Sequence, residues 1–232
     1  MAEAQKKSSN RENTRRQLIL AAEKLFAESG IDGVSLRQIN VAAGQKNSSA
    51  AHYHFGSKIK LILSIYQTRM ESVNQLREAR LQQMEGDGTT DDIRSLVEAI
   101  VYPIVDEIDA DESGQNYIRF MAQAMGHPQL DPVKLQEQEH SGGMFRTVQL
   151  LRDALPHIPP VLLGQRFGLA FEQIVHSLAD REKLRQSSQN TFEIDSALFV
   201  SNLVDVIAGA MSAPISERTH KELERIAAAR GK

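Results

Sequence analysis

The stretch Ser35–Lys58, SLRQINVAAGQKNSSAAHYHFGSK, predicts two short helices joined by a turn and followed by a third helix. Ser35 and Gln38 have the spacing of a capping box, in which a hydroxyl and an amide each bond a free backbone N–H. Gly44 ends the first helix and Gly56 ends the second. The pattern is that of a helix-turn-helix, although a plain three-helix packing unit has the same outline.

The second short helix is expected from Ser48 to His54, with Asn47 as its N-cap. Ala51 and Phe55 are four residues apart and form its expected buried side. The residues that then face outward are Ser48, Ser49, His52 and Tyr53. Such side chains suit phosphate oxygens and base edges, so this face predicts contact with a nucleic acid.

Charge is distributed unevenly along the chain. Residues 1–60 contain ten basic and five acidic side chains, a net charge of +5, whereas the remainder carries −8 of the total of −3. A basic segment on an acidic body favours a polyanionic partner for the N-terminal part. Chance asymmetry is the alternative explanation.

Apolar residues recur with helical period in nearly every segment, so we predict an all-α fold. We expect a polar arm before Thr14, an N-terminal helix-turn-helix domain over residues 1–56, and a helical body over 57–232. A helix over 57–84 is expected to bridge the two. The further helices expected in the body span residues 92–108 with a kink or restart at Pro103, 115–125, 132–155, 161–180, 192–211 and 216–230.

Several classes of function are excluded by what the sequence lacks. Cysteine is absent, which removes disulfides and thiolate chemistry, and the N-terminus lacks the apolar segment of a signal peptide, so we expect a cytoplasmic protein. His52 and His54 are two apart and point to different sides of a helix, which argues against a metal site. Ser57-x-x-Lys60 matches a β-lactamase motif whose partner motifs are missing. We therefore expect no catalytic residues, no metal, no cofactor and no enzyme activity.

Residues 14–61 resemble the DNA-binding domain of the tetracycline-repressor (TetR) family of transcriptional regulators. The resemblance rests on ILAAEKLFAESGIDGVSLRQINVAAG, on a Tyr-His-Phe ending of the next helix, and on Gly-Ser-Lys before an apolar helix. It implies an N-terminal domain that binds double-stranded DNA. The DNA-contacting positions it implies are Ser35, Arg37, Lys46, Asn47, Ser48, Ser49, Ala50, His52, Tyr53, His54 and Lys58.

Between Gly44 and Phe55 the chain has one residue more than the usual family spacing. Alignment backward from Phe55 places Asn47 at the cap, whereas alignment forward from Gly44 shifts the start by one. The register of Lys46, Asn47 and Ser48 is therefore open.

The segment FVSNLVDVIAGAMSAP, residues 199–214, resembles the last dimer helix of one branch of the family. The resemblance implies a homodimer through the helices at 161–180 and 192–211, a near-palindromic operator, and release by a small apolar effector. Candidate lining residues, for which plain core is the alternative, are Phe120, Met121, Met125, Phe145, Phe167, Phe171 and His176. A constitutive DNA-binding dimer with no effector is the alternative function. The choice between repressor and activator, the effector and the operator stay open.

Overall fold

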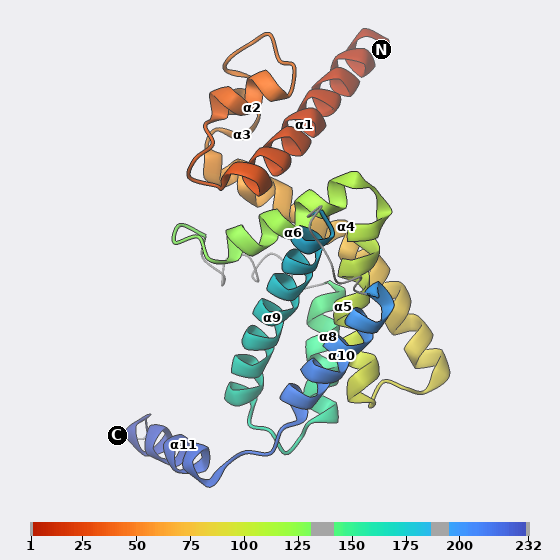
Figure 1. The fold of residues 1–232 in the computed structure, drawn as a ribbon, viewed down its shortest axis with the longest axis vertical. Helices are drawn as coiled ribbons and strands as arrows, with labels where there is room; N and C mark the ends of the chain where they lie inside the picture. Colours follow the sequence, from red (N-terminus) through yellow and green to blue (C-terminus); the bar gives the residue numbers. More distant parts are fainter. Residues whose placement is uncertain (1, 131–141, 187–194, 231–232) are drawn as a thin grey trace.

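The structure is a computed structural model that describes residues 2–130, 142–186 and 195–230. In these ranges every regular element is an α-helix, which confirms the predicted all-α class. Figure 1 shows α1 (Ala2–Ser29), α2 (Leu36–Ala42) and α3 (Ala50–Phe55) gathered at one end of the molecule. We call these three helices the head and the remaining helices the body.

The head packs around a small apolar core to which each of its helices contributes. The buried residues include Leu18, Ala22 and Phe26 from α1, Ile39 from α2, and Ala51 and Phe55 from α3. The predicted burial of Ala51 and Phe55 is thus confirmed.

The start of the first helix was predicted wrongly. α1 begins at Ala2 and runs through Thr14 without a break, so there is no separate polar arm. The segment before Thr14 contains neither Gly nor Pro; its Ala, Gln, Lys, Arg and Glu residues favour a helix, whereas its Ser and Asn residues suit a loop equally well.

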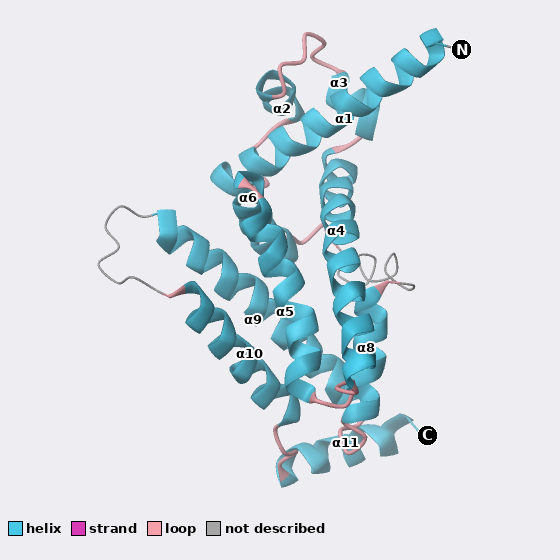
Figure 2. Cartoon of the chain, turned by 90° about the vertical axis from the view of Figure 1, so that its right-hand side faces the viewer, coloured by secondary structure: helices cyan, strands magenta, loops and turns pink. Residues whose placement is uncertain are grey.

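α4 (Lys58–Asp87) begins directly beside the head and runs through the body. Ser57 caps it, because its hydroxyl oxygen accepts a hydrogen bond from the Lys60 backbone N–H at 3.2 Å. Gly88 ends it in the left-handed conformation, with φ 69°. Figure 2 shows α4 passing from the head along α5 and α8, so this one helix contacts both parts of the molecule.

The body continues with α5 (Ile93–Ala110), α6 (Glu112–Met125), α8 (Gly143–Ala154), α9 (Pro160–Gln186), α10 (Ser196–Ser212) and α11 (Glu217–Arg230). α5 continues through Pro103 as one helix, so the helix does not restart at this residue, which was one of the two predicted alternatives. α6 begins earlier than predicted because the Asp111 carboxylate accepts bonds from the backbone of Ser113 and Gly114. The first part of the predicted helix 132–155 and the start of 192–211 lie outside the described residues.

Head and body meet along α6 as well as along α4. The rings of Phe26 in α1 and Phe120 in α6 stack with their centroids 6.0 Å apart. Arg119 and Gln123, also in α6, donate to the Ala27 carbonyl oxygen at 3.1 and 3.4 Å. The sequence predicted the connection through α4 only, whereas α6 contacts α1 more extensively than α4 does.

The described residues contain neither a single membrane-spanning helix nor a cluster of metal-binding side chains. No single helix there has the length and apolar character needed to cross a membrane. Ser196–Ser212 and Glu217–Ala229 reach that threshold only when joined across a 55° bend. In the same residues no three His, Asp or Glu side chains are grouped so as to hold a metal ion.

Candidate nucleic-acid interface

The turn between α2 and α3 is held by a buried asparagine. Asn40 is 2% exposed, and its Oδ1 accepts a hydrogen bond from the Ala51 backbone N–H at 2.8 Å. Its Nδ2 donates to the Ser48 carbonyl oxygen. The capping box predicted at Ser35 and Gln38 is confirmed and fixes the other end of α2. Asn40 was not among the predicted residues, although a polar residue beside the inward-facing Ile39 was a usable signal.

α3 begins later than predicted, at Ala50, with Ser49 as its N-cap. The predicted N-cap, Asn47, lies before this start; its Oδ1 accepts from the Ser49 backbone N–H at 2.9 Å and so closes the turn that leads into the helix. Lys46, Asn47 and Ser48 therefore lie on an exposed loop. Ala50 is only 7% exposed, so its side chain is part of the head core and its prediction as a DNA-contacting side chain is wrong.

The outward face of α3 presents an exposed aromatic side chain among basic groups. Tyr53 is 70% exposed, and its ring meets the His54 ring edge-on with the centroids 5.3 Å apart. The guanidinium carbon of Arg11 lies 5.7 Å from the Tyr53 ring centroid, and that of Arg15 lies 5.5 Å from the Phe55 ring centroid. α1 and α3 therefore share one basic surface.

Partial burial lowers the pKa of His54, and the positive charges of Arg11 and Arg15 lower it further. His54 is thus held neutral more firmly than a free histidine, which favours it as a hydrogen-bonding group and not as a fixed charge. The excess of basic residues over 1–60 pointed to Arg11 and Arg15, but only the packed head shows that they face α3.

The other predicted positions flank this surface. Arg37 and His52 are exposed, whereas the polar atoms of Ser35 are engaged with Gln38 in the capping box. Lys58 is half-buried, and its Nζ donates to the Asp32 carbonyl oxygen at 3.4 Å. Every predicted position except Ala50 is thus exposed or half-buried in the head or at the start of α4.

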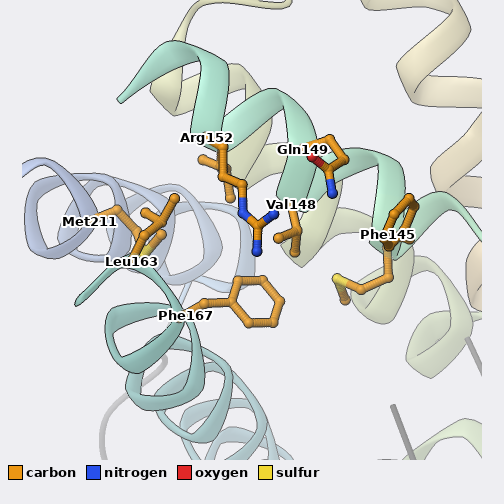
Figure 3. Close-up of a pocket in the computed structure, with 10 residues that line it drawn as sticks. Phe145, Val148, Gln149, Arg152, Leu163, Phe167 and Met211 are labelled. Carbon is orange, nitrogen blue, oxygen red and sulfur yellow. The ribbon is translucent and has the colours of Figure 1, made fainter. Parts of the chain in front are cut away.

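The body contains a pocket of about 400 Å³ between α8 and α9, closed on one side by Met211 of α10. Buried Met144, Leu151 and Leu163 form part of its lining. Figure 3 shows Phe145 and Val148 of α8 on one side, Phe167 of α9 opposite, and the polar residues Gln149 and Arg152 beside them.

Two of the predicted lining residues, Phe145 and Phe167, lie in this pocket. Phe171 stacks on Phe167 with centroids 6.2 Å apart, outside the pocket lining. Phe120 and Met121 are buried core residues of α6, and Met125 packs against that core, so none of the three lines the pocket. His176 is exposed on α9, which contradicts its predicted place in a cavity.

A buried ionic cluster that the sequence did not predict joins head and body. Arg69 of α4 binds both carboxylate oxygens of Glu23 in α1, at 2.7 and 2.8 Å. It also donates to Glu107 of α5 and Ser113 of α6, each at 2.7 Å. Burial raises the pKa of Glu23, an effect that Arg69 partly opposes. The cluster ties four helices together around one guanidinium.

The two parts of the chain match two family models. Residues 18–65 match the model described as bacterial regulatory proteins, tetR family, and residues 98–210 match that described as tetracyclin repressor-like, C-terminal domain. The chain belongs to the TetR family of transcriptional regulators. The exposed face of α3 in this TetR-family chain lies within the residues that match the first model.

Curated relatives of this TetR-family chain include two named repressors. The HTH-type transcriptional repressor NicS of Pseudomonas putida is 28% identical over 169 residues, which are 70% of this chain and 68% of the relative. The HTH-type transcriptional repressor AcnR of Corynebacterium efficiens is 38% identical over 53 residues, only 23% of this chain and 28% of that relative. Most of the length of AcnR is thus outside the comparison.

Solved structures support the same fold. A protein from a Shewanella species, assigned to the TetR family of transcription regulators, superposes with a TM-score of 0.61 at 15% identity, over 85% of this chain and 97% of the other. The TetR-family regulator PfmR of Thermus thermophilus does so with a TM-score of 0.51 at 17% identity, over 82% and 96%. At these identities the likeness shows the fold alone.

Proposed function

We propose that this chain is a homodimeric repressor that binds a near-palindromic operator and leaves it when a small effector occupies the body. We divide it into a DNA-binding domain, residues 1–56, and an effector and dimerisation domain, 57–232. The observation that carries the DNA-binding part is the face of α3, where Tyr53 is 70% exposed beside the basic residues of α1. The repressor names of two relatives support the direction of the response.

In this proposal α3 lies in the major groove, where its exposed residues meet bases and phosphates. His52 and Tyr53 are exposed, and Tyr53 lies on the side of α3 opposite the buried Ala51 and Phe55. The loop residues Lys46, Asn47, Ser48 and Ser49 precede α3 and are exposed beside it. Ser49, His54, Arg37 and Lys58 are proposed to contact the phosphate backbone, which positions the helix.

Dimerisation is proposed through α9 and α10. These helices pack against each other and carry exposed apolar side chains: Leu169 and Leu198, each 69% exposed, with Val161 at 53% and Val206 at 46%. Exposed apolar patches of this kind mark contact sites between proteins. A two-fold axis there would place two copies of α3 in successive major grooves, about 34 Å apart.

The pocket between α8 and α9 supports a repressor that responds to an effector. The alternative, a constitutive DNA-binding dimer, needs no ligand pocket. α8 is linked to α4 by Arg146, which pairs with Glu78 and Glu85. α4 is linked to the head by the Arg69–Glu23 pair. We propose that a ligand which displaces α8 shifts α4 and thereby changes the spacing of the two heads, so that both half-sites are lost together.

The test begins with the operator, selected from random duplexes, and measures affinity by gel shift at several salt concentrations. Tyr53→Ala is expected to weaken binding by about tenfold to a hundredfold, as for loss of a hydrogen bond to a charged group. Lys58→Ala is expected to weaken binding and to reduce the salt slope by about one unit.

Lys221→Ala provides the matched control, because Lys221 is an exposed lysine of α11, far from the head. It is expected to keep both the affinity and the salt slope, and all three variants are expected to keep the melting temperature and the dimer. Normal operator binding by Tyr53→Ala and Lys58→Ala would show that the proposed face is wrong.

A further inference from the structure

The pocket between α8 and α9 has one charged side chain in an otherwise apolar and uncharged lining. Among the described residues around it, Arg152 carries a charge and the others are apolar side chains, Gly164 and Gln149. Figure 3 shows the guanidinium of Arg152 turned toward the space between Val148 and Phe167. A cation in this position attracts an anionic group on whatever occupies the pocket.

No protein group among the described residues neutralises this charge. Within that part of the chain Arg152 has neither an ion pair nor a hydrogen bond, whereas Arg146, six residues earlier in α8, pairs with Glu78 and Glu85. Arg152 lies in the last turn of α8, where a cation interacts favourably with the helix end. That interaction accounts for a basic residue in this turn, but it does not require a guanidinium directed into a pocket.

The remaining walls define the rest of the ligand. Phe145 and Phe167 offer ring faces, while Met144, Leu163 and Met211 provide apolar surface that is nearly closed to solvent. Aromatic side chains favour stacked or edge-on contact with a planar partner. A volume of about 400 Å³ is at the lower end of the range for small-molecule sites and suits roughly one or two rings.

We propose that the effector is an aromatic monocarboxylate, whose ring packs between Phe145 and Phe167 and whose carboxylate pairs with Arg152. Gln149 lies beside Arg152 in the lining and supplies a neutral donor for the second carboxylate oxygen. The inference rests on the proposed effector response. It narrows the chemical class of the effector from an apolar molecule to one with an anionic end. Such a ligand contacts α8 through both its ring and its carboxylate, so its binding is expected to displace that helix.

The experiment compares acids with their neutral amides on the full-length protein. Benzoate, phenylacetate and naphthoate are each titrated beside benzamide, phenylacetamide and naphthamide by isothermal titration calorimetry, without DNA. At least one acid is expected to bind saturably and about tenfold or more tightly than its amide, as for a charged hydrogen bond at a partly exposed site.

Variants then assign the preference to Arg152. Arg152→Gln is expected to remove the preference for the acid, and Arg152→Lys, which keeps the charge but not the planar fork, to retain part of it. Arg225→Gln, at an exposed arginine of α11, is expected to keep it in full. Each variant's melting temperature without ligand separates loss of binding from loss of fold.

The proposal is overturned if no acid binds, if the amides bind equally well, or if Arg152→Gln keeps the preference. Operator release, measured separately by fluorescence anisotropy, distinguishes this failure from failure of the proposed function. Binding of an acid through Arg152 without operator release would uphold the ligand class and contradict the effector response. Release by neutral molecules alone would uphold the response and contradict the ligand class.

Discussion

Asn40 shows how one buried side chain can define a DNA-binding surface that it does not touch. It bonds the Ser48 carbonyl and the Ala51 N–H, and so fixes where the loop ends and α3 begins. We predict that Asn40→Ala destabilises the head by about 1–3 kcal/mol, because two buried backbone groups lose their partner. Amide hydrogen exchange over residues 36–55, followed by mass spectrometry, is expected to accelerate.

The neighbouring Val41 is 73% exposed and provides the control. Val41→Ala is expected to change stability by less than about 0.5 kcal/mol, as for other surface substitutions. Equal exchange rates in the two variants would show that Asn40 does not hold the turn.

Glu23 contributes a pH dependence to the junction between head and body. Its pKa is raised by burial, so its carboxyl group holds a proton more tightly in the folded than in the unfolded state. Its contribution to stability is therefore fully present below the ordinary value of 4.5 and is lost as pH rises through the raised pKa. Glu23→Gln is uncharged at every pH and lacks this dependence.

We predict that the unfolding free energy of Glu23→Gln improves relative to that of the wild type as the pH rises from below 4.5 to neutrality. Urea unfolding at successive pH values measures the difference. Glu28→Gln, at an exposed position of the same helix, is expected to show no such trend. A difference that stays constant for Glu23→Gln across this range would contradict the assignment.

The C-terminus of α4 contains two glycines in different backbone environments. Gly88 adopts φ 69°, and its N–H bonds the Met84 carbonyl, whereas Gly86 lies inside the helix with free space around the position of a Cβ. We predict opposite effects for the same substitution at these two sites. Gly88→Ala is expected to cost about 1–2 kcal/mol because of the left-handed backbone, and Gly86→Ala to gain up to about 1 kcal/mol of helix propensity.

Thermal and urea unfolding of the two variants beside the wild type decide this prediction. Shifts of the same sign would mean that the C-terminus of α4 rearranges on substitution, and that Gly88 does not set its length.

At the scale of the whole molecule, DNA affinity depends on two heads being joined. Leu169→Glu or Leu198→Glu places a charge on the proposed α9–α10 face, and burial of an unpaired charge is strongly unfavourable. We predict that either variant is monomeric by size-exclusion chromatography with light scattering. Operator affinity is expected to fall by about a hundredfold or more, because linked binding of the two half-sites is lost.

Val41→Glu serves as the control for added charge, since Val41 is 73% exposed on α2 in the head and belongs to neither α9 nor α10. It is expected to keep the dimer. A dimer that survives both leucine substitutions would place the interface on other helices.

The sequence alone determined those features of this protein that depend on neighbours along the chain. The capping box at Ser35 and the glycine stop at Gly56 were predicted correctly, because helix ends are set by groups within a few residues of one another. The buried pair Ala51 and Phe55 followed from helical period for the same reason. Helix type was thus predictable throughout, whereas the start of α1 was not, since residues before Thr14 suit helix and loop alike.

The tertiary structure decided every contact between helices that are distant in sequence. Ala50 is buried because α3 packs against α2 and α4, so its side chain is not available to DNA. Phe120 is buried because it stacks on Phe26, so it is not available to an effector. Glu23 and Arg69, 46 residues apart, meet only when α4 crosses α1. The pocket beside Arg152 exists only because α8 and α9 stand apart. The crossing of helices depends on how whole faces of side chains fit together, and no local period records that fit.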